Sequence, residues 1–254
     1  MTGAGIIRTR TITWAKEVMK MTELAYMDDC YAKELDATVT AAEGNNLELD
    51  RTIFCPQAGG VECDKGTMGC GETAYNVVFV KKDKGRVLHQ LEMPGLKLGD
   101  RVHLSLDWDR RYLLMRYHTS AHLISGIFAK DLGAKITGNS LTTEKGRIDF
   151  DLESFDRALI EQCFDKAREL IKKDLPIDIY SLPRSDVESK PEMVKLAMGL
   201  PPNIKVLRIV DIKGFDAQPD GGCHVKSLGE VGEIKFLSAD NKGKSNRRVY
   251  YRLR

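Results

Sequence analysis

The chain has 254 residues, of which 42% are apolar and 30% charged, a composition typical of globular proteins that argues against wholesale disorder. No apolar run approaches the roughly 20 residues that a membrane helix needs, and no apolar signal segment follows the basic N-terminal residues. The six cysteines include no Cys-x-x-Cys pair, so we expect free thiols and a cytoplasmic location. Cys55, Cys63 and Cys70 lie near one another, but their spacing matches no common zinc motif.

Residues 1–20 show no pattern that joins them to the rest, and we expect them to be a dispensable N-terminal extension. From Met21 to about Leu106, short alternating segments separated by Gly-rich turns predict a small closed β-barrel. The strands expected in this region cover residues 36–41, 47–50, 74–80, 86–91 and 99–106.

After Asp107 the pattern changes to helices mixed with strands. Asp109 is expected to cap a helix that runs to about Leu132 and stops at Gly133, and Ser154 to cap a second helix through about Lys173. Further strands are expected at 148–152, 176–180, 205–212, 233–237 and 249–253, with a partly helical segment at 185–198. The fold class is therefore α+β. A barrel over 21–106 precedes an α/β two-layer domain over 107–254, whose sheet is mainly antiparallel.

Histidine is scarce, and three of the five histidines fall in two short segments. His118 and His122 are four residues apart on the predicted helix, which places two imidazoles on one face about 5–6 Å apart. That spacing suits a shared metal ion, although Thr119 stands where the zinc-protease motif requires glutamate. Two buried histidines without a metal are the alternative.

The second segment, residues 218–225, contains the potential ligands Asp220, Cys223 and His224 around two glycines. Two helical histidines joined by one or two ligands from a distant loop form an ordinary zinc site. Neighbouring residues in an extended segment point to opposite faces, which favours Asp220 over Cys223 beside His224. Cys223 or water in the fourth position, or a glycine-rich turn with a surface aspartate, remain as alternatives.

Four motifs in order resemble those of the AlaX-type alanyl-tRNA editing proteins, which are free-standing relatives of the editing domain of alanyl-tRNA synthetase. They are a glycine-rich motif at 52–60, His-Thr-x-x-His at 118–122, Arg-Ile-Asp-Phe at 147–150, and Asp-Gly-Gly-Cys-His at 220–224 followed by Glu-Val-Gly at 230–232. The chain departs from the family pattern at Asp220, where Cys is usual, at Cys223, where Thr is usual, and at Val61, where Gln is usual.

The resemblance implies an enzyme, a hydrolase that deacylates tRNA(Ala) mischarged with Ser or Gly. A synthetase pocket rejects such smaller or near-isosteric residues by little more than about 10²-fold, so a second site must destroy the product. The implied site holds one Zn²⁺ per chain through His118, His122, Asp220 and His224, with no catalytic group beyond a metal-bound water. The implied substrate-binding residues are Thr119, Gly59, Gly60, Arg147, Gln218, Gly221 and Gly222.

The C-terminal residues 235–254 carry seven Lys or Arg against the single acid Asp240. We expect Lys242, Lys244, Arg247 and Arg248, in or beside a predicted exposed loop, to contact the tRNA backbone. Charges that only keep the protein soluble are the alternative. Neither DNA nor a membrane is expected as a partner. Two other functions remain open: a non-catalytic tRNA- or synthetase-binding module with a degenerate metal site, and a deacylase for another aminoacyl ester.

Overall fold

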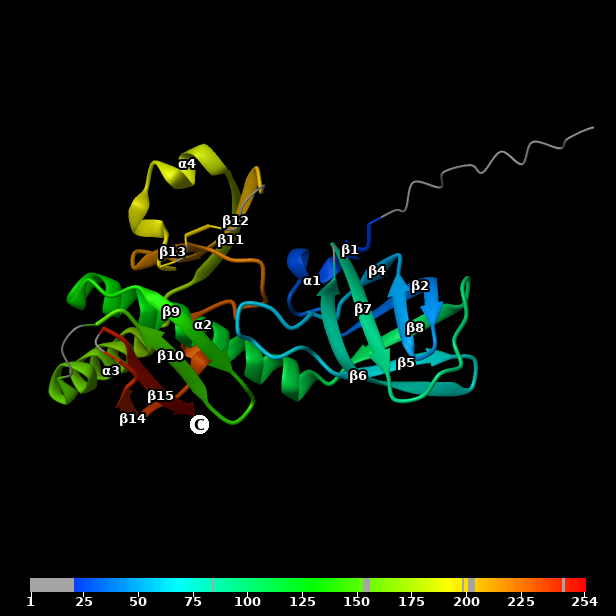
Figure 1. The fold of residues 1–254 in the computed structure, drawn as a ribbon, viewed down its shortest axis with the longest axis horizontal. Coiled ribbons are helices and arrows are strands. Elements are labelled where there is room, and N and C mark those ends of the chain that lie inside the picture. The colour runs from blue at the N-terminus through cyan, green and yellow to red at the C-terminus, as the bar shows by residue number, and fades with distance from the viewer. Residues whose placement is uncertain (1–20, 84, 153–155, 198, 201–203, 244) are drawn as a thin grey trace, which may run out of the picture.

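The computed structural model describes residues 21–83, 85–152, 156–197, 199–200, 204–243 and 245–254, so the expected extension at 1–20 lies outside the described residues. Figure 1 shows a barrel and a separate sheet, with the long helix α2 (Trp108–Leu132) reaching from one to the other. A mixed fold of barrel, helices and antiparallel sheets is thereby confirmed. No helix in the described ranges is both long and apolar enough to cross a membrane.

Six antiparallel strands close the barrel in the order β2-β3-β7-β6-β5-β8. Alternate side chains such as Val39, Val80 and Leu104 fill its interior, as the period of two in the sequence predicts. The strand Gly66–Cys70 was not expected, because its two glycines resemble a loop. The barrel strands are β2 (Glu34–Glu43), β3 (Asn46–Leu49), β5 (Gly66–Cys70), β6 (Thr73–Asp83), β7 (Arg86–Leu91) and β8 (Arg101–Leu106), and beside them lie β1 (Glu23–Leu24), α1 (Ala25–Asp28) and β4 (Arg51–Thr52).

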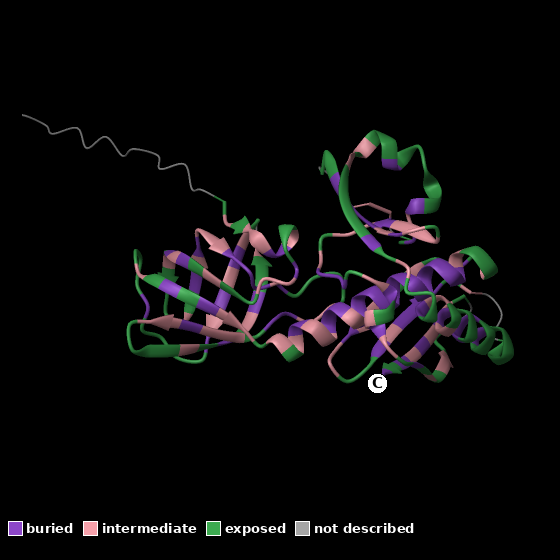
Figure 2. Cartoon of the chain, turned by 180° about the vertical axis from the view of Figure 1, so that it is seen from behind, coloured by how far each residue is buried: buried purple, intermediate pink, exposed green. Residues whose placement is uncertain are grey.

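Helix α2 begins two residues earlier than expected, and its N-cap is Asp107 rather than Asp109. The carboxylate of Asp107 accepts a hydrogen bond from the backbone N–H of Arg110 at 3.1 Å, whereas Asp109 falls within the first turn. Gly133 ends the helix with φ 66°, as predicted. Figure 2 shows that much of α2 is buried, since it packs against several parts of the molecule.

The rest of the chain forms two antiparallel sheets where the sequence predicted one. A four-stranded sheet, ordered β14-β15-β10-β9, packs against α2 and α3, and a three-stranded sheet, ordered β11-β12-β13, stands apart from it. Asp156 caps α3, and the expected cap Ser154 lies outside the described residues. The elements are β9 (Ile136–Leu141), β10 (Gly146–Phe150), α3 (Arg157–Lys172), β11 (Ile177–Pro183), α4 (Arg184–Glu188), η1 (Pro191–Met193), β12 (Val206–Ile212), β13 (Asp216–Pro219), η2 (Leu228–Val231), β14 (Ile234–Asn241) and β15 (Arg247–Leu253).

The loop of residues 55–64 extends out from the barrel and is hydrogen-bonded to β9. Backbone hydrogen bonds join Leu141 N–H to Gly60 C=O at 2.7 Å and Glu62 N–H to Leu141 C=O at 3.1 Å. Gly60 has φ 78°, and a Cβ atom there would lie 2.5 Å from the carbonyl oxygen of Asn139. A glycine is therefore required for this close approach.

The barrel contains a titratable core group, His89, which is fully buried. Its Nε2 lies 2.8 Å from the hydroxyl of Thr52, and burial lowers its pKa to about 4. An unfolded histidine has a pKa near 6.5, so between these values the unfolded chain binds a proton that the folded chain does not. We expect the free energy of unfolding to fall by up to about 3 kcal/mol as pH drops from about 6.5 to about 4.

Urea unfolding of the wild type and of His89→Gln across this pH range measures the effect. The difference between the two proteins isolates His89 from the other histidines, and its pH dependence should follow the window above. Identical pH dependence in both proteins would show that His89 does not carry this effect.

Candidate active site

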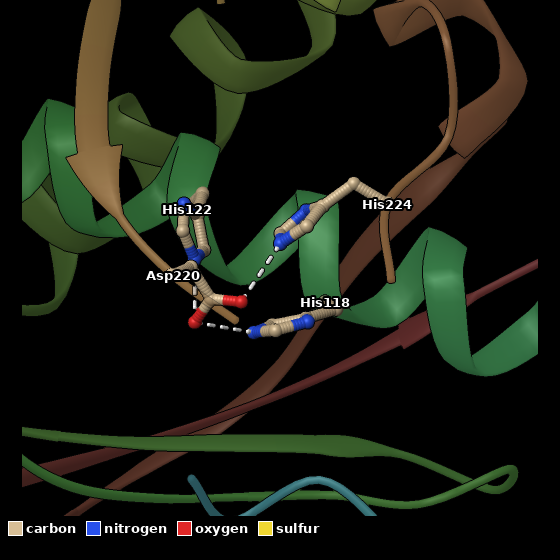
Figure 3. Close-up of side chains that lie close together, drawn as sticks. All are labelled: His118, His122, Asp220 and His224. Carbon is tan, nitrogen blue, oxygen red and sulfur yellow. Dashed lines mark hydrogen bonds and ion pairs between the residues drawn. The ribbon is translucent and has the colours of Figure 1, made fainter. Parts of the chain in front are cut away.

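Four side chains from two distant parts of the chain converge on one point (Figure 3). His118 and His122 project from one face of α2, Asp220 follows the end of β13, and His224 follows four residues later. One ligand atom from each lies within 4.8 Å of the others. Within the described ranges no other group of three or more His, Cys, Asp or Glu side chains is arranged in this way, and Cys55, Cys63 and Cys70 form no such group.

The three distances from Asp220 to the histidine nitrogens are close to those between the ligands of a tetrahedral metal ion. Asp220 oxygens lie 3.4 Å from His118 Nε2, 3.7 Å from His122 Nε2 and 3.3 Å from His224 Nε2. Two ligands bound tetrahedrally to zinc at about 2.1 Å would be about 3.4 Å apart. Three imidazole nitrogens and a carboxylate oxygen are also a donor set that zinc accepts.

The environment of the group holds two of its members, His224 and Asp220, in the protonation states that bind metal. Burial, reinforced by the charges of His118 and His122, lowers the pKa of His224 well below its usual value. Burial raises the pKa of Asp220, but the neighbouring histidines outweigh it and hold that pKa well below the usual range. For His118, burial lowers the pKa, but the neighbouring Asp220 outweighs burial, and the pKa of His118 is raised overall. A neutral His224 and an ionised Asp220 are the forms that bind metal, whereas His118, whose pKa is raised, releases its proton on binding a metal ion.

Cys223 does not join the histidines. Its thiol is buried, lies 3.6 Å from the carbonyl oxygen of Tyr26 and contacts the thiols of Cys30 and Cys55. The structure thus brings Asp220, and not Cys223, to the group of histidines.

Two residues expected to contact substrate, Thr119 and Gln218, are buried beside the histidines. Thr119 is fully buried; its hydroxyl is 3.1 Å from Nδ1 of His224 and accepts the backbone N–H of Val225 at 3.3 Å. Gln218 is also buried, and its amide donates to His122 C=O and Ser125 Oγ, both at 3.1 Å. Both side chains hold the segment of residues 218–225 against α2, a long-range pairing that sequence alone does not reveal.

The two glycines of this segment differ in what they face. The backbone N–H of Gly222 donates to Asp220 Oδ1 at 2.5 Å, and a Cβ atom at residue 222 would lie 2.6 Å from Cε1 of His118. A Cβ atom at Gly221 would meet only the methyl of Met27, at 3.8 Å. Gly222 is therefore required for the close packing of the loop on His118, whereas Gly221 has room.

A cavity of about 200 Å³ lies beside the group, between it and the loop of residues 55–64. Gly59, Val61, His118, Asp220 and Gly222 contribute to its lining. Gly60 packs on β9 instead, and Arg147 hydrogen-bonds Asn139 C=O at 3.2 Å from outside the lining. Other lining residues that the sequence analysis did not single out include Glu62 and Lys82. The position of Glu62 beside the glycine-rich motif indicates that it lies near the site. Lys82 lies at a charged strand end, where the sequence pattern does not indicate a site residue.

The basic C-terminal residues are mostly engaged within the protein. Arg247 is buried, and its guanidinium donates to Asn241 Oδ1 at 2.8 Å and to Gly243 C=O at 2.7 Å, so the expectation of an exposed Arg247 is wrong. Arg248 pairs with Asp149 at 2.8 and 2.9 Å, and Lys242 lies 3.6 Å from Asp240. Lys244 lies outside the described residues.

Comparison with known proteins places these features in a family. The family model described as "Threonyl and Alanyl tRNA synthetase second additional domain" matches residues 207–250, and that described as "tRNA synthetases class II (A)" matches residues 9–110. An alanyl-tRNA editing protein AlaX-M from Saccharolobus solfataricus is 41% identical over 92% of this chain and its own full length. The chain belongs to the AlaX-type alanyl-tRNA editing proteins.

Other relatives agree with this assignment. An AlaX-M protein from Methanosarcina barkeri is 40% identical over 92% of this chain and 99% of its own length. The alanine–tRNA ligase of Ignicoccus hospitalis is 34% identical over 92% of this chain, which corresponds to 26% of the ligase.

The two glycines provide a matched pair of variants. We expect this group to bind zinc, and Gly222→Ala to displace His118 and weaken that binding by about tenfold or more, whereas Gly221→Ala should bind zinc like the wild type. Competition titration against a zinc chelator measures both affinities. Equal affinities in the two variants would show that the packing of Gly222 on His118 does not shape the site.

Thr119 supplies a second test, because residues that orient metal ligands commonly change affinity by 10–100-fold when removed. Thr119→Val should weaken zinc binding by about tenfold or more, since it removes the hydroxyl beside His224 Nδ1. Thr119→Ser keeps the hydroxyl and should retain most of the affinity. The same titration decides, and wild-type affinity in Thr119→Val would contradict this role.

Proposed function

We propose that this protein hydrolyses, in trans, the ester of tRNA(Ala) mischarged with Ser or Gly, using Zn²⁺ held by His118, His122, Asp220 and His224. The observation that carries the proposal is the position of this ligand group at a small cavity in a member of the AlaX family. A cavity of about 200 Å³ suits an aminoacyl group with a small side chain.

The protein's own residues would bind and orient the ester. Bound Zn²⁺ would polarise the ester carbonyl, activate water or hold the substrate amine. Asp220 is fixed by the N–H of Gly222, and His224 by the hydroxyl of Thr119, so the ligands are preorganised before substrate arrives. Val61 and Gly59 close the cavity from the barrel side and limit the size of the acyl group.

The two parts of the chain would each supply a different part of the site. In this proposal, residues 21–106 supply the loop that covers the acyl group, and residues 107–254 supply the metal ligands. Lys242 and Arg248 stay candidates for contacts with the tRNA backbone, because each side chain keeps exposed surface beside its carboxylate partner.

Two other functions are possible for this site: binding of tRNA or a synthetase without catalysis, and deacylation of another aminoacyl ester. Both are favoured by Val61, which lines the cavity at a position where the resemblance expects Gln. Val61 in place of Gln would change which acyl group the cavity accepts. The hydrolysis of several aminoacyl esters must therefore be compared.

The test is deacylation of Ser-, Gly- and Ala-tRNA(Ala) by purified protein of measured zinc content. We expect hydrolysis of the Ser or Gly ester and sparing of the Ala ester. His118→Ala should lose most zinc and at least about 10²-fold of the activity, because one of four ligands is removed. His103→Ala, at an exposed barrel histidine, is the matched control.

Two results would contradict the proposal. One is full zinc occupancy with normal hydrolysis in His118→Ala. The other is a sulfur neighbour near 2.3 Å in X-ray absorption, which would replace Asp220 by a cysteine. Absence of hydrolysis alongside tight tRNA binding would instead support the binding module.

A further inference from the structure

A second pocket, of about 460 Å³, lies at the opposite end of β13 from the metal ligands. The end of α2, the short helix η1 and the turn before β13 surround it. Four lysines line it, namely Lys130, Lys135, Lys190 and Lys195. None of the site residues predicted from the sequence lies here.

The pocket carries an excess of positive charge. Lys195 is buried and pairs with Asp216 at 3.1 Å. Lys130 donates to the carbonyl of Phe215 and lies over its ring, without a carboxylate partner among the described residues. Lys135 and Lys190 are exposed, and neither ammonium has an ion-pair or ring partner in the described part of the chain. Besides Asp216, the lining includes one further carboxylate, Glu192, so two positive charges remain in excess.

An exposed aromatic ring accompanies these charges. Tyr180 on β11 lines the pocket with 37% of its surface exposed. Its hydroxyl donates to Asp211 Oδ2 at 3.4 Å, and the Lys213 ammonium lies 5.7 Å from its ring centroid. Cations at the end of a helix also complement its dipole, which accounts for Lys130. That explanation does not extend to Lys190 or Tyr180, which come from other elements. A cationic groove with an exposed aromatic side chain is the arrangement that binds single-stranded nucleic acid.

The pocket lies within reach of the metal ligands along two independent elements. Lys130 is eight residues beyond His122 on α2, about 12 Å at 1.5 Å per residue. Asp216 is four residues before Asp220 along an extended segment, about 13 Å at 3.3 Å per residue. A further cavity is lined by Asp220 and Gly221 and also by Tyr180, so a strand whose terminal ester sits at the ligands can follow that surface to the pocket within a few nucleotides.

We propose that this pocket binds phosphates of the single-stranded 3′ end of tRNA, with a base stacked on Tyr180. The inference rests on the proposed function, because it assumes that the ester lies at the metal ligands. Lys135 and Lys190 supply the phosphate contacts, and Lys195 with Asp216 keeps the pocket in shape.

Binding of uncharged tRNA(Ala) at several salt concentrations tests the proposal. The variant Lys135→Ala/Lys190→Ala should lose at least fivefold in affinity at low salt, and its slope of log affinity against log salt should flatten by between one and two units. The charge-matched control is Lys97→Ala/Lys173→Ala, at two exposed lysines remote from the pocket, and it should leave affinity and slope near wild type.

Substitutions at Tyr180 test the stacking contact separately from the charge contacts. Tyr180→Ala should lower affinity at least fivefold with an unchanged salt slope, while Tyr180→Phe should bind like the wild type. A short oligonucleotide with the tRNA 3′ sequence should compete with tRNA in the wild type and much less in the double lysine variant. Inorganic phosphate at matched ionic strength should not compete.

The outcomes separate this inference from the proposed function. The proposal is overturned if the double lysine variant keeps the wild-type tRNA affinity and salt slope, or if the control variant loses as much affinity as the double lysine variant. Effective competition by inorganic phosphate would also overturn it, in favour of a site for the free ion. If mischarged tRNA is not hydrolysed but the lysine and tyrosine effects are observed, the proposed function fails while the pocket stands.

Discussion

The buried ion pair between Arg111 and Asp64 sets the geometry on which the site depends. The guanidinium is 1% exposed, and its Nε lies 3.0 Å from both carboxylate oxygens. It also donates to the carbonyl of Cys30, and Asp64 accepts the N–H of Cys55. Two charges taken out of water are tolerated only when their hydrogen bonds are nearly all satisfied, as here. The pair thereby fixes α2, the segment after α1 and the loop of residues 55–64 in one register.

His118 lies seven residues beyond Arg111 on the same helix, about 10 Å along its axis. The ion pair therefore places His118, a candidate metal ligand, at a fixed distance from the loop that covers the cavity. Burial of a charged pair contributes little net stability, but loss of one partner leaves a buried charge that costs about 3–5 kcal/mol. The pair thus selects one arrangement of barrel and helix against alternatives.

Much of this arrangement could be predicted from local patterns. Alternation predicts most barrel strands, and the spacing of His118 and His122 predicts a shared face because helix geometry is regular. Predictions failed where a partner distant in sequence decides the outcome. Arg247, expected beside an exposed loop, is buried because carbonyl oxygens of a turn surround its guanidinium. Strands β9 and β13 were missed because Gly, Asn and Pro interrupt their apolar pattern.

The loop over the cavity is fastened to β9 by its main chain. The bonds at Gly60, Glu62 and Leu141 use backbone groups, so the cover does not depend on which side chain stands at residue 61. Val61 lines the cavity from this fixed backbone. A substitution at residue 61 can therefore change the lining of the cavity while the backbone hydrogen bonds of the loop persist. The main chain thus sets the position of the loop, and the side chain at residue 61 sets only the wall that the loop presents to the cavity.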